Sequence, residues 1–129
     1  MKLIKHFVKR GKPILTICRG SLFVASTHGS KISKITNHVK KNHNIMCNNR
    51  LINTNSFHNF QIKNRPRNFE IIGVSKDRNV EMMYSNSKKI LGLMFHPERK
   101  NKSQSFIDNM LKSFLNGNCD FSSWQKFEV

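Results

Sequence analysis

The stretch Lys12-Pro13-Ile14-Leu15-Thr16-Ile17-Cys18-Arg19-Gly20 decides the fold. Its apolar run is opened by a proline and is too short for a buried helix, so it predicts a strand inside a parallel sheet. The following residues 21–25 predict the start of a helix that ends near Gly29. The sequence therefore predicts a cysteine held on the turn between a strand and a helix.

A cysteine in this place suits a nucleophile. The free N–H groups at the start of the helix, and the positive end of its dipole, stabilise a thiolate and a developing oxyanion. Gly20 would allow the close backbone approach that such a turn needs. A free cysteine after a buried strand also packs well as a small apolar side chain. The spacing by itself leaves both interpretations open.

A second pattern, His96-Pro97-Glu98, ends the apolar residues 90–95. Histidine can act as a general base toward a thiol, and a nearby carboxylate can fix its tautomer and stabilise the imidazolium. Alone, this triplet is equally compatible with a solvated turn. Together with Cys18 it supplies the nucleophile, base and orienting carboxylate of an acyl-transfer site.

The remaining pattern predicts one domain over residues 1–117 and a tail over 118–129. Residues 31–49 are polar and predict a long connection with at most a short strand at 44–47. Apolar residues at helical spacing predict helices near both ends of the domain, at residues 3–10 and at 106–115, the second capped by Ser103 or Ser105. Further strands are predicted at residues 51–55, 69–75, 80–84 and 90–95.

The charge balance is strongly basic. Among 129 residues, 23 are Lys or Arg and 7 are Asp or Glu, for a net charge of +16. This charge favours anionic partners such as phosphate-bearing molecules or nucleic acid, but it also fits a solvated basic surface. The sequence carries no zinc-finger, helix-turn-helix or RNA-recognition signature, so nucleic acid is not the favoured partner.

Other residue counts predict a cytoplasmic protein without metal. The three cysteines are odd in number and have no paired spacing, which is typical of a reducing compartment. No apolar run approaches the roughly 20 residues that span a membrane, and residues 1–10 lack a signal-peptide core. The histidines, among them His28, His38, His43 and His58, lack a metal-ligand spacing. We therefore expect no metal and no cofactor.

Three motifs resemble one family. Residues 12–20 resemble the nucleophile motif of class I glutamine amidotransferases, and residues 92–98 resemble their His-Pro-Glu motif. Between them, Asn55-Ser56-Phe57-His58-Asn59 is similar to a segment of the gamma-glutamyl-gamma-aminobutyrate hydrolase branch. Within that branch, the residues of these motifs look most like those of the gamma-glutamyl-CDP-amidate hydrolases of capsule phosphoramidate synthesis. The motifs keep the family's order from about residue 3 to residue 115.

The resemblance implies an α/β fold with a flavodoxin-like sheet flanked by helices. It also implies hydrolysis of a gamma-glutamyl amide through a thioester, releasing glutamate from a small, nucleotide-linked substrate. Cys18 would be the nucleophile, His96 its base and Glu98 the orienting carboxylate. The Arg19 N–H would donate to the oxyanion. The segment Ser56, Phe57 and His58 would line the glutamyl pocket.

The chain departs from the family in two places. Thr16 stands where relatives usually have glycine, and its β-branched side chain is expected to crowd the turn. Full-length relatives also carry N-terminal strands and a Gly-rich loop that completes the oxyanion hole. Those strands are missing here, so the expectation is a partial domain, a fragment with little activity, or a chain that needs a partner to supply them. The alternatives are a basic nucleic-acid-binding protein and a non-catalytic fragment that binds a partner subunit.

Overall fold

The computed structural model describes residues 1–36 and 39–129, and for Lys40 the backbone alone. His38, part of the expected polar connection, lies outside the described residues. Three α-helices, eight strands and one 3-10 helix follow one another in the described part. In chain order they are α1 (Lys2–Lys9), β1 (Ile14–Ile17), α2 (Arg19–Thr27), β2 (Ile32–Lys34), β3 (Val39–Cys47), β4 (Arg50–Phe57), β5 (Phe60–Ile62), β6 (Glu70–Ser75), β7 (Val80–Ser85), β8 (Ile90–Leu93), α3 (Gln104–Leu115) and η1 (Phe121–Ser123).

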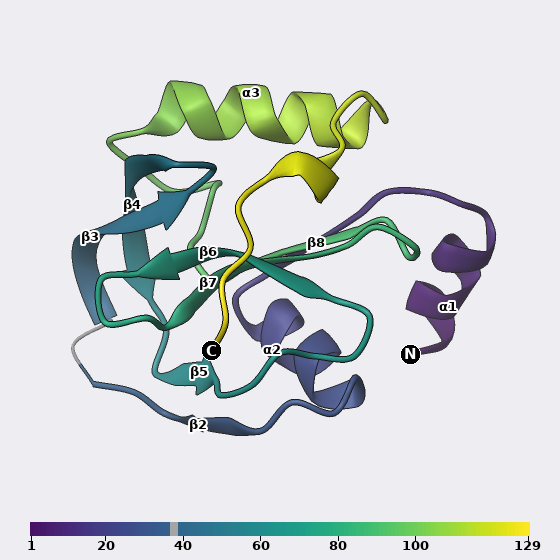
Figure 1. Cartoon of the computed structure of the whole chain (residues 1–129), viewed down its shortest axis with the longest axis horizontal. Helices are drawn as coiled ribbons and strands as arrows, with labels where there is room; N and C mark the ends of the chain where they lie inside the picture. Colours follow the sequence, from purple (N-terminus) through teal and green to yellow (C-terminus); the bar gives the residue numbers. More distant parts are fainter. Residues whose placement is uncertain (37–38) are drawn as a thin grey trace.

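Six of the strands form one mixed sheet in the order β1-β8-β7-β6-β3-β4. Among the described strands, only β1 and β8 run parallel, with Ile14 opposite Ile90 and Ile17 opposite Leu93. The other pairs are antiparallel, and β2 pairs with β5 in a separate two-stranded sheet. In Figure 1, α3 lies above the large sheet, α2 lies on its other side, and α1 lies beyond the β7–β8 hairpin. The expected α/β sheet flanked by helices is confirmed.

The core has two layers because side chains alternate along each strand. Met82 and Leu91 belong to the layer under α3, which also holds Ile107, Met110 and Phe114 of that helix. Met83 and Ile90, their sequence neighbours, belong to the layer under α2, with Val24 and Ala25. The two helices therefore cover opposite faces of the same strands.

The predicted long connection over residues 31–49 is wrong. The described part of this stretch contains β2 and the nine-residue β3. β3 carries few apolar residues, so it lacks the alternation that predicts a strand. Hydrogen bonding to β4 on one side and β6 on the other forms it instead, and only Ile45 and Cys47 enter the core beneath α3. Neighbouring strands, rather than local pattern, decide this element.

The expected crowding by Thr16 is also wrong. Its hydroxyl lies 2.9 Å from the Ser21 hydroxyl, which donates to the Leu93 carbonyl at 2.8 Å. The Thr16 side chain has room because Gly92, opposite it on β8, has no side chain. A Cβ atom on Gly92 would lie 3.1 Å from the Thr16 hydroxyl and 2.7 Å from Met83 Cε. A Cβ on Gly20 would meet Thr16 at an ordinary 3.6 Å, so Gly20 is not required for that contact.

The last twelve residues pack on the domain. Phe121 is fully buried beside Tyr84, with ring centroids 4.9 Å apart, and the Phe127 N–H donates to the Ile71 carbonyl at 2.9 Å. Ser103 begins α3, but its hydroxyl does not cap the helix; it accepts a hydrogen bond from the Asn53 N–H at 2.8 Å. Within the described residues, no helix is long and apolar enough to cross a bilayer.

Burial raises the pKa of the Cys47 thiol to about 11, from an ordinary value of 9.0. The folded protein therefore holds this proton more tightly than the unfolded chain. The contribution of the buried neutral thiol to stability is complete below pH 9 and is lost as the pH rises to about 11. We predict that, as the pH rises from 9 to 11, the free energy of unfolding falls by up to about 3 kcal/mol more in wild type than in Cys47→Ala, which lacks the thiol. Urea unfolding at pH 7.5, 9 and 10.5 measures this, and parallel curves for the two proteins would contradict it.

Candidate active site

Cys18 lies at a strained strand-to-helix turn. It follows the last residue of β1 and precedes the first residue of α2, with φ 49° and ψ −105°. A non-glycine residue in such backbone geometry costs about 1–3 kcal/mol and is typical of functional sites. The Cys18 N–H donates to the Leu93 carbonyl at 2.7 Å, which extends the β1–β8 pairing into the turn. The predicted turn is present, and its backbone resembles a nucleophile elbow.

The surroundings of Cys18 keep it a thiol rather than a thiolate. Partial burial raises its pKa above 9.0, and the buried carboxylate of Glu81 adds to this. A hydrogen bond from the Arg19 N–H and the charges of Arg99 and Arg19 oppose the rise without cancelling it. A neutral thiol reacts slowly, so attack near pH 7 would need a base close by.

His96 and Glu98 form a short hydrogen bond. His96 Nδ1 and Glu98 Oε1 lie 2.6 Å apart, which fits an Nδ1–H that donates to the carboxylate. Some burial tends to raise the pKa of Glu98, but the hydrogen bond and charge of His96, with the charge of Arg99, bring it below 4.5. This arrangement leaves the other ring nitrogen of His96 able to accept a proton.

The parallel pairing of β1 and β8 brings these groups to one end of the sheet. Cys18 is the first residue after β1, and His96 is the third after β8. Because parallel strands finish at the same edge, the cysteine turn and the His-Pro-Glu loop share that edge. A nucleophile, a base and an orienting carboxylate at one edge could perform acyl transfer.

The segment after β4 divides between this site and the interior. Phe57 packs edge-on against His96, with ring centroids 5.9 Å apart, and the Arg99 guanidinium lies 4.5 Å from the centre of the Phe57 ring. Ser56 and His58, the other predicted pocket residues, are both buried. Of the three, Phe57 is the residue whose ring reaches His96.

His58 faces a buried carboxylate. Its Nδ1 lies 2.9 Å from the Phe60 carbonyl, and its Nε2 lies 3.3 Å from Glu81 Oε1. His43 Nε2 lies 3.6 Å from the same oxygen, and Glu81 is fully buried. Sequence analysis did not single out Glu81, although a glutamate inside an otherwise apolar strand could have marked it.

Sequence analysis also missed two asparagines that contact the His96 backbone. Asn55 of β4 accepts from the His96 N–H at 2.9 Å and donates to the His96 carbonyl at 2.7 Å. Asn101 donates to the same carbonyl at 3.1 Å. Asn55 lies within the quoted motif, but nothing in the local sequence indicates its partner, which is 41 residues away.

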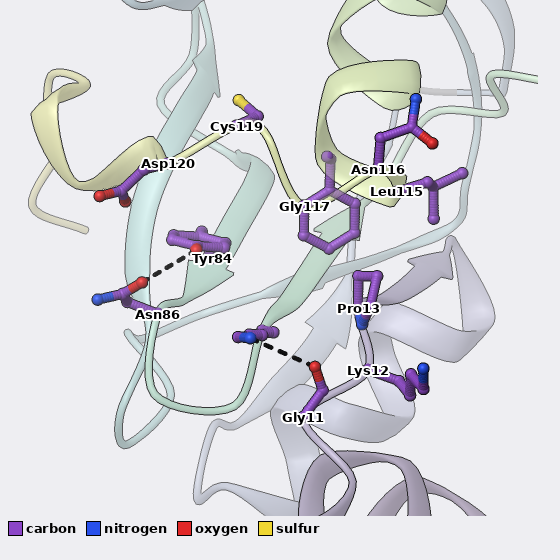
Figure 2. Close-up of a pocket in the computed structure, with 12 residues that line it drawn as sticks. Gly11, Lys12, Pro13, Tyr84, Asn86, Leu115, Asn116, Gly117, Cys119 and Asp120 are labelled. Carbon is purple, nitrogen blue, oxygen red and sulfur yellow. Dashed lines mark hydrogen bonds between the residues drawn. The ribbon is translucent and has the colours of Figure 1, made fainter.

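A cavity of about 380 Å³ lies at the opposite end of the parallel pair. Gly11, Lys12 and Pro13 line it just before β1, and Leu115 to Gly117 line it at the end of α3. Figure 2 shows the Tyr84 hydroxyl bonded to Asn86 on its wall, at 3.2 Å, with Asp120 nearby. Because Cys18 and His96 follow the other ends of their strands, this cavity is separate from the candidate site.

No cluster of three or more His, Cys, Asp or Glu suited to a metal occurs among residues 1–36 and 39–129. All three cysteines are free thiols: Cys18 and Cys119 are partly exposed, and Cys47 is buried.

Several known proteins are similar to this chain in sequence. A gamma-glutamyl-CDP-amidate hydrolase of Campylobacter jejuni is 35% identical over 89 residues, which are 69% of this chain and 44% of the relative. The carbamoyl phosphate synthase small chain of Clostridium perfringens is 36% identical over 119 residues, or 87% of this chain and 34% of the relative. A glutamine-hydrolyzing GMP synthase subunit of Methanobrevibacter smithii is 33% identical over 104 residues, covering 74% and 53%. The chain thus spans from about a third to about half of these relatives.

Solved structures share the fold. A GMP synthase subunit protein from Thermoplasma acidophilum superposes with a TM-score of 0.72 at 23% identity, covering 88% of this chain and 61% of that one. A glutamine amidotransferase from Thermotoga maritima gives a TM-score of 0.65 at 19% identity, covering 92% and 55%. The sequence model of the class-I glutamine amidotransferases matches residues 1–115. The chain therefore belongs to the class-I glutamine amidotransferase family.

Proposed function

We propose that Cys18, His96 and Glu98 act together to hydrolyse a gamma-glutamyl amide. One observation carries this proposal. The loop in which His96 Nδ1 lies 2.6 Å from Glu98 Oε1 comes directly after β8, and β8 pairs in parallel with β1, the strand that leads to Cys18. The strained Cys18 backbone and the family membership of the chain support it.

The proposed chemistry has two steps. His96 takes the thiol proton, and Cys18 sulfur bonds to the gamma-carbonyl carbon. The carbon–nitrogen bond breaks, and the amine leaves with the proton from His96. Water then attacks the thioester with His96 as base, which releases glutamate and restores the thiol. The Arg19 N–H, already directed at the Cys18 sulfur, would donate to the oxyanion in both steps.

The substrate we propose is a small gamma-glutamyl amide, with gamma-glutamyl-CDP-amidate as the specific candidate. The similarity to the Campylobacter jejuni hydrolase supports this choice. The excess of Lys and Arg is compatible with a nucleotide-linked leaving group. Ser56, Phe57 and His58 remain the proposed glutamyl-binding segment; the Phe57 ring contacts the His96 ring, and the other two residues are buried. Free thiols at all three cysteines fit the cytoplasm.

We also propose a partner polypeptide at the outer edge of β1. In the described part of the chain, β1 pairs with β8 and with no strand on its other side. Its four residues are ILTI, three of them half-buried, and parallel strands are normally covered on both sides. Two relatives are named as a synthase small chain and a synthase subunit, which are names of proteins with partner chains, and this supports an assembly here too.

Labelling tests the nucleophile. A glutamine-analogue diazoketone should alkylate Cys18 in preference to Cys119, which lies outside the candidate site, and Cys47, which is buried with a pKa of about 11. Mass spectrometry of tryptic peptides measures the ratio, and Cys18→Ala serves as the control. Equal modification of all three cysteines would contradict the proposal.

A substitution tests the orienting carboxylate. Glu98→Gln should lower the limiting rate of Cys18 labelling roughly 10- to 100-fold at pH 7, because an amide neither fixes the His96 tautomer nor stabilises its charge. Since the pKa of Glu98 is below 4.5, its ionisation should not alter wild-type labelling between pH 6 and 8. Glu70→Gln, which removes an exposed ion pair to Arg65, is the matched control. A similar rate for the two variants would count against a role for Glu98.

Turnover tests the need for a partner. Purified residues 1–129 should hydrolyse gamma-glutamyl amides poorly, because the proposed partner beside β1 is then absent. If that partner supplies an oxyanion donor, its absence typically costs about 10²–10³ in rate. Glutamate release by the chain alone is the measurement. Ordinary turnover that Cys18→Ala abolishes would refute this prediction while supporting the nucleophile.

A further inference from the structure

We propose that Asn55 and Asn101 are positioning residues that hold the His96 backbone and thereby place its imidazole. This inference rests on the proposed function, in which His96 is the base for Cys18. It concerns two buried carboxamides, one on β4 and one in the loop between β8 and α3, that both bond to His96.

Asn55 holds both polar backbone atoms of His96. Its Oδ1 accepts from the His96 N–H at 2.9 Å, and its Nδ2 donates to the His96 carbonyl at 2.7 Å and to the Lys100 carbonyl at 3.3 Å. The side chain is 2% exposed, so water does not replace these bonds. A carboxamide has a donor and an acceptor on one carbon; an aspartate has only acceptors and would oppose the His96 carbonyl.

Asn101 closes the loop onto the same strand. Its Oδ1 accepts from the Asn55 N–H at 2.7 Å, and its Nδ2 lies within 3.1 Å of the His96 carbonyl and 2.8 Å of the Arg99 carbonyl. The next contact along the strand joins the Ser103 N–H to the Asn53 carbonyl at 3.1 Å. Residues 96–103 therefore follow the outer edge of β4 and satisfy backbone groups that an edge strand would otherwise expose.

The same strand also restrains the His96 ring. Phe57, two residues after Asn55 on β4, packs edge-on against the imidazole, while Glu98 fixes Nδ1. The backbone of His96, its ring face and its tautomer are thus each held by a separate contact. A displacement of about 1 Å at a reacting group can cost about 10²-fold in rate. Loss of the Asn55 contact should therefore change the chemistry of Cys18 more than the binding of a reagent.

The test compares Asn55→Asp with Asn53→Asp in the full chain. The second variant makes the same change two residues away, where the side chain bonds to Asn44 rather than to His96. For the diazoketone probe, Asn55→Asp should lower the limiting rate of Cys18 labelling at least about tenfold. The half-saturating concentration should stay within about twofold, and Asn53→Asp should leave both constants near wild type.

The pH profile separates positioning from a general loss of structure. Alkylation of Cys18 by iodoacetamide at pH 7 should be faster in wild type than in Asn55→Asp, because a placed His96 removes the thiol proton. In Asn55→Asp the rate should rise only at alkaline pH, as for an isolated thiol whose pKa is raised by burial. Near-UV circular dichroism checks the fold of each variant.

Each outcome decides the inference. Labelling of Asn55→Asp at the wild-type limiting rate overturns it while the proposed function stands. Failure of wild type to label at Cys18 overturns the proposed function, and the inference with it. If Asn55→Asp does not fold, Asn101→Ser is measured in the same way. Failure of both to fold, with Asn53→Asp folded, also overturns the inference, because the pair would then hold the fold rather than place the imidazole.

Discussion

The parallel pairing of β1 with β8 is the constraint on which the candidate site depends. Four residue pairs, from Ile14 opposite Ile90 to Ile17 opposite Leu93, set two distant segments in register. The bond from the Cys18 N–H to the Leu93 carbonyl carries this register one step past the strands. Gly92 lies opposite Thr16 in this pair, and its lack of a side chain leaves space for the Thr16 side chain just before the turn. A shift of register here would separate the cysteine from the histidine loop.

The antiparallel part of the sheet has a different role. It extends from β8 through β7, β6 and β3 to β4, and the loop that follows β8 runs back along the outer edge of β4. The candidate base therefore depends on two separate parts of the sheet: it follows β8, and the edge strand β4 holds its backbone through Asn55. The buried polar residues Glu81 and His58 lie in this same region, with the partly buried His43 beside Glu81. Burying such groups costs folding free energy unless they are paired, so they mark a part of the interior that holds polar rather than apolar side chains.

Much of the site could be predicted because its signals are local. A proline-opened apolar run, a cysteine and a helix start lie within one short stretch, and His-Pro-Glu lies directly after another strand. Contacts between Asn55, Asn101 and His96 could not be predicted, since a lone asparagine is most often a turn or surface residue. β3 was missed for a related reason: its residues are polar, and its two neighbours form it.

The sequence by itself determined the order of the motifs, the two helices that cover the sheet and the residues of the candidate site. These follow from periodicity and residue type, which act over a few positions along the chain. Only the tertiary structure decided which strands are neighbours, that Phe57 meets the His96 ring while His58 turns inward, and that two asparagines hold the His96 backbone. The contacts of Asn55 and Phe57 with His96 join segments about 40 residues apart, and Asn101 is held in place by the Asn55 N–H, 46 residues away. This geometry exists only once the strands of the sheet have come together.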